Sequence, residues 1–183
     1  MNNSSPGSEA RSIGKTTNLR TLDWQRLGIL YLRLALGASF LSGIADRFGL
    51  YTGSNVGYGN FTGFLHYTAK VNSFMPASTI PFLGWSATAL ELSLGIALVA
   101  GIWLRWAALG SSLLLVLFGT AMAISFGIKS PLDYSVFSAS AGALVLALQE
   151  FRKAREKSRK LSIGLSDKRG TPASSQPESM TIA

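Results

Sequence analysis

The chain has 183 residues, of which 48% are hydrophobic and only 14% are charged, whereas a soluble domain typically has about 25% charged residues. It has no cysteine and a single histidine, which excludes a disulfide framework, a dithiol redox centre, a thiolate metal site and a bis-histidine haem site formed by this chain alone. The formal net charge is +8, and the basic residues lie mainly outside the apolar segments. This pattern is typical of an integral membrane protein.

Residues 1–23 are polar and basic, and we expect a disordered tail there. A first apolar segment over residues 24–48 is long enough to cross a bilayer, which takes about 20 residues of helix. Arg33 lies inside this segment, about two turns from its start. Asp46 and Arg47 close it, and an adjacent pair of opposite charges most often ends a helix in the headgroup region. The alternative is that both line an outward mouth.

A long loop over residues 50–80 follows, and its apolar residues recur at helical spacing from Phe61 to Met75. Asn60 is the expected N-cap and Pro76 the expected stop. An amphipathic helix lying in the interface fits this segment, since it is short and carries His66. A helix covering the mouth of the bundle is the second interpretation. His66 is expected to be a surface residue, and its functional alternative is a proton donor above a site.

The second span, over residues 81–103, contains one carboxylate, Glu91. At about 100° per residue, Gly84, Thr88, Glu91 and Gly95 fall on one small and polar face, which is the kind that packs against another helix. An ionisable residue inside a membrane span is a candidate functional site. Glu91 therefore points into the bundle in this interpretation.

Arg33 is the favoured partner of Glu91, in a structural ion pair inside the bundle. At about 1.5 Å of rise per residue, the two differ by about 10 Å in height, a gap that two long side chains can largely close. Alternatively, Glu91 carries protons or binds a quinone carbonyl, and Arg33 extends to the headgroups. Arg33, Thr88 and Glu91 together form the candidate intramembrane site.

The third span covers residues 106–126 and the fourth, the least hydrophobic, covers residues 132–151. Ser130 and Pro131 have the form of a helix start, with Asp133 three residues after Ser130. Capping explains Asp133, and contact with a ligand from the outer mouth is the alternative for Asp133 and Tyr134. No metal site is expected.

Residues 152–183 begin with a polybasic extension of the fourth helix and continue with a Ser/Pro-rich stretch from Thr171 that we expect to be disordered. Attraction to anionic lipids accounts for the basic run, so no nucleic-acid partner is expected. The run consists of Arg152, Lys153, Arg155, Lys157, Arg159 and Lys160.

The distribution of charge predicts the topology. Thirteen Lys and Arg residues lie in the two terminal segments, at the very start of the first span (Arg26) and in the Arg105 turn, whereas three lie in the two loops on the other side. By the positive-inside rule both termini are cytoplasmic and the long loop is extracytoplasmic. The expected fold is therefore an all-α integral membrane four-helix bundle in residues 24–151, with one long extracytoplasmic loop.

The chain resembles the DoxX family of small bacterial four-helix membrane proteins. The segments that carry the likeness are LRLALGASFLSGIADRFG in the first span, TAKVNSFMP in the loop, ALELSLGIALVAGIWLRWAAL and KSPLDYSVFSASAGA. Some members are membrane subunits of quinone-linked oxidoreductases, and others are linked to oxidative-stress complexes. The resemblance implies a location in the bacterial inner membrane, a redox-enzyme partner and a quinone as the cofactor.

The leading functional hypothesis is an accessory membrane subunit of such a redox assembly. A self-sufficient oxidoreductase is not expected, since the sequence has no cysteine, no haem ligand set and no nucleotide-binding motif. The alternatives are a carrier of small solutes or protons through Arg33 and Glu91, and a membrane assembly factor for a partner protein.

Overall fold

The computed structural model describes residues 9–169, which are helical along most of their length and contain no strand. The all-α prediction is thus confirmed. The helices are α1 (Glu9–Arg47), α2 (Phe61–Val71), α3 (Ile80–Ala100), α4 (Leu104–Phe126), α5 (Lys129–Asp133) and α6 (Val136–Arg169), with short 3-10 turns at Gly53–Asn55 and Ala77–Thr79.

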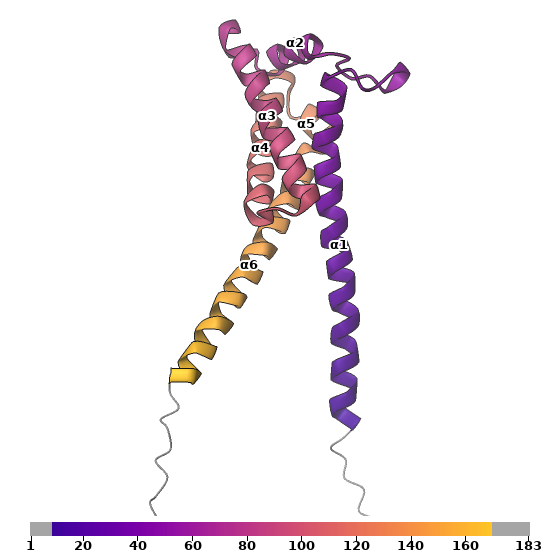
Figure 1. Cartoon of the computed structure of the whole chain (residues 1–183). Coiled ribbons are helices and arrows are strands. Elements are labelled where there is room, and N and C mark those ends of the chain that lie inside the picture. The colour runs from indigo at the N-terminus through magenta and orange to yellow at the C-terminus, as the bar shows by residue number, and fades with distance from the viewer. Residues whose placement is uncertain (1–8, 170–183) are drawn as a thin grey trace, which may run out of the picture.

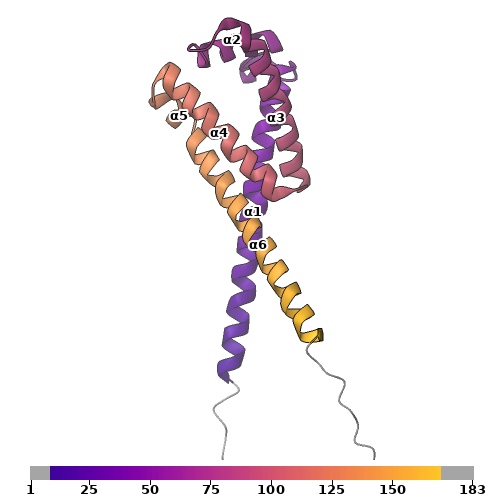
Figure 2. The same cartoon turned by 90° about the vertical axis from the view of Figure 1, so that its left-hand side faces the viewer.

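The four long helices associate mainly as two pairs, α1 with α3 and α4 with α6, and the pairs pack on each other through α3–α4 and α1–α6 contacts. The short helix α2 lies across one end of this bundle, where it contacts α1, α3 and α4 (Figure 1). At the other end α1 and α6 extend well beyond the bundle, as both views show (Figure 2). We call the α2 end the outer end and the opposite end the inner end.

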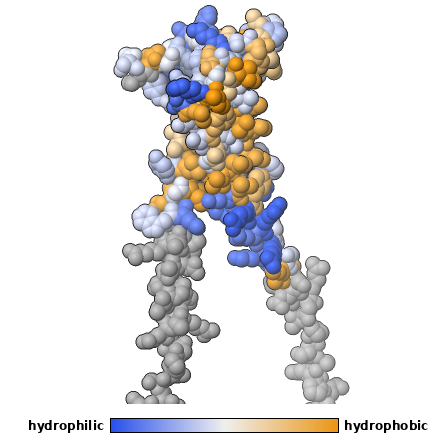
Figure 3. All heavy atoms as spheres, turned by 180° about the vertical axis from the view of Figure 1, so that it is seen from behind, coloured by the Kyte–Doolittle hydropathy of each residue, from blue (hydrophilic) through white to orange (hydrophobic). Residues whose placement is uncertain are grey.

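Three segments are long and apolar enough to cross a membrane, Trp24–Arg47, Ala77–Ala100 and Leu104–Phe126. They agree with the predicted spans 24–48, 81–103 and 106–126. Many of their large apolar side chains are exposed, and the hydrophobic surface gathers on the bundle between the outer and inner ends (Figure 3). This is the surface of a multi-pass membrane protein. The assignment of 132–151 as a fourth span remains a prediction, although the first half of α6 packs within the bundle.

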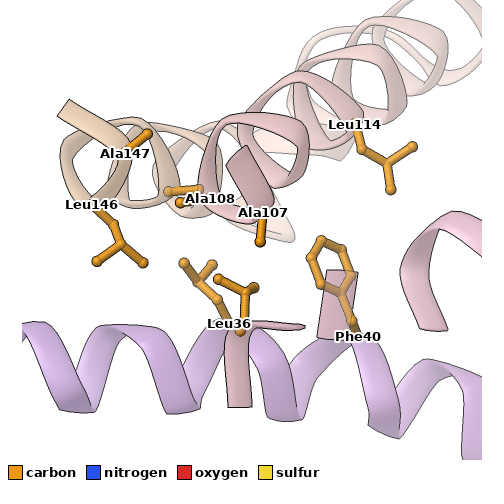
Figure 4. Packing of buried hydrophobic residues seen from close by; sticks show 9 residues of the cluster. Leu36, Phe40, Ala107, Ala108, Leu114, Leu146 and Ala147 are labelled. Carbon is orange, nitrogen blue, oxygen red and sulfur yellow. The ribbon is translucent and has the colours of Figure 1, made fainter. Parts of the chain in front are cut away.

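The apolar core lies at the inner half of the bundle, where all four long helices contribute. Alanines on α4 and α6 face larger side chains on α1 and α3, and this pairing of small with large lets the helices approach closely (Figure 4). The buried members are Leu36, Phe40, Leu98, Ala107, Ala108, Leu114, Ala143, Leu146 and Ala147.

The structure corrects the predicted start of the domain. Residues 9–23, expected to be disordered, are the start of α1. The basic run 152–160 is a helical extension, as predicted, because α6 continues beyond the bundle to Arg169. Residues 1–8 and the predicted disordered stretch 171–183 lie outside the described residues.

The start of the last helix also differs from the prediction. Ser130 does not cap it, because residues 129–133 form the separate short helix α5. Ser135 then adopts a left-handed conformation, with φ of 55°, and its carbonyl accepts a hydrogen bond from the Ala139 N–H. The left-handed residue separates α5 from α6, a break that the sequence pattern does not mark.

Glycine permits the close approach of α1 and α3. A Cβ atom added to Gly37 would lie 2.7 Å from Val99 Cγ2 and 3.1 Å from the Gly95 carbonyl oxygen, whereas a Cβ at Gly28 would meet nothing within 4 Å. Gly37→Ala should therefore destabilise the protein by about 1–3 kcal/mol through overpacking, and Gly28→Ala should not. Thermal unfolding of the two variants in detergent tests this, and equal stabilities would contradict it.

Candidate functional site beneath α2

A buried ion pair joins α1 to α3 at the outer end of the bundle. Arg47, the last residue of α1, donates from Nη2 to both carboxylate oxygens of Glu91, at 2.8 and 2.7 Å. Its Nη1 donates to the Thr88 hydroxyl oxygen at 3.0 Å, and that hydroxyl donates to the Gly84 carbonyl one turn earlier. Arg47 and Glu91 are each 4% exposed. We call Arg47, Thr88 and Glu91 the polar cluster.

The face of α3 that holds this cluster is the predicted one. Gly84, Thr88, Glu91 and Gly95 are all buried on α3. Thr88 and Glu91 are three residues apart, so their side chains lie on the same face of α3 and both reach Arg47 of α1. Gly84 and Gly95, on either side of them, leave room for neighbouring helices to approach.

The partner of Glu91 is Arg47, however, so the predicted pair of Arg33 with Glu91 is wrong. Arg33 instead donates to the Val99 carbonyl oxygen at 3.4 Å, and a Cβ at Gly101 would lie 2.7 Å from its Nη1. Since Val99 follows Glu91 by two turns of α3, Arg33 lies near the inner end. The candidate intramembrane site therefore keeps Thr88 and Glu91 and exchanges Arg33 for Arg47.

Phe64 of α2 covers the polar cluster. The Arg47 guanidinium carbon lies 3.6 Å from the centroid of the Phe64 ring, which is a cation–π contact. Phe64, Thr68 and Val71 form the buried face of α2. The helix thus covers the bundle mouth, the second of the two interpretations of this segment, and Asn60 caps it as predicted by accepting from the Gly63 N–H at 2.8 Å. It ends at Val71, before Pro76.

Asp46, next to Arg47, holds the loop that leads into α2. Its carboxylate accepts hydrogen bonds from the backbone N–H groups of Gly57 at 3.1 and 3.2 Å, Tyr58 at 2.6 Å and Gly59 at 3.5 Å. Asp46 and Arg47 are both buried, so the expectation that they simply end a helix in the headgroup region is wrong. Neighbouring residues on a helix point about 100° apart, and here one faces the loop and the other faces α3.

One donor of the polar cluster has no acceptor among the described residues. Arg47 Nε is buried and unpaired, although both of its Nη atoms are hydrogen-bonded. A buried donor without a partner is uncommon in proteins. It gives the cluster the capacity to donate one further hydrogen bond.

Aromatic rings surround the cluster on the outer side. Tyr58 meets the Phe64 ring edge-on at 5.3 Å and lies 5.4 Å from Tyr67, and Phe61 packs against Phe64 and against Trp85 at 4.3 Å. Burial, with a smaller effect of Tyr67, raises the pKa of the Tyr58 hydroxyl from 10.0 to about 12. Tyr58 therefore stays neutral at physiological pH.

This raised pKa predicts a dependence of the loop on alkaline pH. Below pH 10 the Tyr58 hydroxyl is protonated whether the loop is closed or open, so the closed loop keeps its full stability. Between pH 10 and about 12 an opened loop loses the proton first, so the closed state loses stability as the pH rises. The difference in tyrosinate absorbance between the protein and its Tyr58→Phe variant should report ionisation near pH 12. A midpoint near pH 10 would contradict the buried position.

The remaining predicted site residues are not brought to the cluster. His66 is exposed on α2, consistent with a surface residue. Asp133 is exposed and forms an ion pair with Lys129 one turn away within α5, so it does not cap α6. Tyr134 is 74% exposed. Of the residues predicted to line an outer mouth (Asp46, Arg47, His66, Asp133 and Tyr134), only the first two are thus buried at the outer end.

Sequence reasoning missed Phe64, Tyr58 and the three N–H groups bound by Asp46. The available signal was the adjacency of an acidic and a basic residue before a loop with glycines at positions 57 and 59. A Cβ at Gly57 would lie 2.8 Å from Asp46 Oδ2, so that glycine permits the approach of backbone to carboxylate.

In a comparison with known protein families, the sequence model described as DoxX matches residues 28–126, more than half of the chain. This range includes the polar cluster, Asp46 and the whole of α2. Neither curated proteins nor solved structures give a match.

Proposed function

The chain belongs to the DoxX family, and we propose that it is an accessory membrane subunit of a quinone-linked or oxidative-stress redox assembly. The observation that carries this proposal is the polar cluster under Phe64, with the unpaired Arg47 Nε at the outer end of a membrane bundle. A polar group built into such a position is expensive, and it usually serves a function.

The residues around the cluster fit the head group of a quinone. A quinone has two carbonyl oxygens, which accept hydrogen bonds, and a flat ring, which packs on aromatic side chains. Arg47 supplies a buried donor, and Tyr58, Phe61 and Phe64 supply aromatic faces. A bound quinone supplies the acceptor for electrons delivered by a partner enzyme. This chain would bind and orient the head group and exclude water, and the neutral Tyr58 would adjoin it.

The lipid-facing surface supports a role within an assembly. In the three candidate spans, 22%, 28% and 39% of the most hydrophobic window is buried within the chain. The rest is half-buried or exposed, and its exposed part offers a large apolar area to lipid or to membrane helices of a partner.

We also propose that this protein lies in the bacterial inner membrane with both termini in the cytoplasm, so that α2 faces outward. The support is the excess of basic residues at the inner end. Reporter fusions after Phe151 and within residues 57–74 test the orientation. If both reporters were found on the same side of the membrane, the proposed orientation would be contradicted.

The solute or proton carrier has less support. Its proposed path contains Arg33 and Glu91. Arg33 on α1 contacts Val99, about two turns of α3 away from Glu91, and Glu91 is paired with Arg47. The assembly factor remains an alternative that co-purifying proteins can distinguish.

The decisive experiment is purification of the full chain from native membranes in mild detergent, followed by extraction of quinone and identification of bound proteins. We expect quinone and a redox enzyme. Arg47→Lys keeps a cation for Glu91 but removes Nε and the fork of two Nη donors. It should therefore release the quinone while lowering thermal stability less than Arg47→Leu does. Arg33→Lys, the matched control at the inner end, should retain it. A non-redox client without quinone would favour the assembly factor, and a lone chain that moves solute in liposomes would favour the carrier.

A further inference from the structure

The inner end of the bundle presents a second charged region, distinct from the polar cluster. Arg105, in the first turn of α4, lies over two aromatic rings, 5.7 Å from the centroid of Trp106 and 5.9 Å from that of Phe151. Trp106 and Phe151 meet edge-on at 5.2 Å. Because Phe151 directly precedes Arg152 on α6, the exposed cation of α4 lies where the basic run of α6 begins.

Exposed tryptophans lie at the same end. Trp24 on α1 is 72% exposed, Trp103 in the turn between α3 and α4 is 82% exposed, and Trp106 is 56% exposed. Trp prefers the level of the lipid head groups, where its ring is half in hydrocarbon and its N–H reaches polar groups. Three elements thus place the head-group layer at the inner end, level with Arg105.

The cations at this level are exposed and few are neutralised. All six basic residues of the α6 run are exposed, and Lys153 with Glu150 forms the only ion pair found there among the described residues. Hydrophilic residues gather on α6 where it leaves the hydrophobic bundle (Figure 3). At the outer end, by contrast, Arg47 is buried with Glu91 and Lys129 pairs with Asp133.

The length of the basic run matches the reach of a charged membrane surface. From Arg152 to Lys160 the helix rises by about 12 Å, which is comparable with the Debye length of about 8–10 Å at ionic strengths of roughly 0.1–0.15 M. The first turn of the run therefore lies among the head groups, and the rest stays within the potential of an anionic leaflet.

We propose that Arg105, Arg152, Lys153 and Arg155, which we call the inner collar, bind the phosphate groups of anionic phospholipids. The tryptophans fix the depth of the lipid, and the guanidinium and ammonium groups select head groups with a net negative charge. The chemistry recognised is a phosphate ester, and its source is a membrane lipid rather than free phosphate.

The test uses the full chain in vesicles of mixed phosphatidylcholine and phosphatidylglycerol, with spin-labelled lipids to measure the preference of the protein for each. Wild type should prefer the anionic lipid. The double variant Arg105→Gln/Arg152→Gln should lose this preference by roughly fivefold for each cation removed. The matched control, Lys70→Gln/Lys129→Gln, removes two cations at the outer end and should leave it unchanged.

Three outcomes would overturn the proposal. The first is an equal loss in the inner and outer variants, which would reflect net charge alone. The second is loss of the preference on addition of inorganic phosphate at unchanged ionic strength, which would mark a free-phosphate site. The third is an unchanged lipid preference with release of a co-purifying acidic protein by the inner variant, which would assign the inner collar to a protein partner.

Discussion

Replacing Glu91 with leucine should destabilise the folded protein by about 3–5 kcal/mol, because it strands the Arg47 guanidinium in a buried site. Arg47 is 4% exposed, and it lies at the end of α1 with its side chain directed between α1 and α3. Without the carboxylate it keeps only the Thr88 hydroxyl and the Phe64 ring as partners. Glu91→Gln should cost less, since the amide oxygen still accepts a hydrogen bond.

A double-mutant cycle identifies the partner. Arg47→Leu together with Glu91→Leu removes both charges and should recover much of the stability lost in Glu91→Leu alone. Arg33→Leu together with Glu91→Leu leaves Arg47 stranded and should recover nothing. Thermal unfolding in detergent distinguishes them. Strictly additive losses for Arg47 and Glu91 would refute the ion pair.

Replacing Asp46 with alanine should detach the loop before α2 and lower stability by about 1.5–3 kcal/mol, the range for hydrogen bonds to a charged group. The Gly57 and Tyr58 N–H groups lose their acceptor, so hydrogen exchange at these amides should accelerate well before exchange in α3 does. The stability of Asp46→Asn should lie between that of wild type and that of Asp46→Ala, since the carboxamide oxygen can still accept a hydrogen bond.

Asp133→Ala is the matched control for this change. Asp133 is also an aspartate at the outer end, but it is exposed and pairs only with Lys129, so its loss should change stability by less than about 0.5 kcal/mol. If Asp46→Ala changed the loop amides no more than Asp133→Ala does, Asp46 would not hold the loop.

Hydrophobic periodicity predicted three spans and the buried face of α3, because these depend on the local sequence. It placed Glu91 inside the bundle correctly, since a lone carboxylate among small residues has to find a partner there. It did not identify that partner, because height within a bundle depends on where each helix begins. Figure 1 shows that α3 starts farther out than the point where α1 ends. Glu91, in the middle of α3, therefore lies level with Arg47 at the end of α1.

The loop could not be predicted in the same way. Asp46 binds N–H groups of residues 57–59, and backbone groups carry no sequence signal of their own. The helix pattern of α2 gave its N-cap correctly, yet the pattern continued to Met75 while the helix ends at Val71. There the Asn72 side chain donates to the Thr68 carbonyl oxygen at 2.9 Å, and this local bond competes with continuation of the helix.

The ion pair between α1 and α3 has a consequence for the insertion of this protein into the membrane. A carboxylate alone in the middle of a span raises the cost of insertion by about 2.5–3.5 kcal/mol on scales measured at the translocon. Because α1 precedes α3 in the chain, Arg47 has already been delivered to the membrane when Glu91 arrives, and it can neutralise the charge as α3 enters. The pair α1–α3 can therefore form before α4 and α6 are made, so the order of synthesis lets Glu91 meet its counterion as it leaves water.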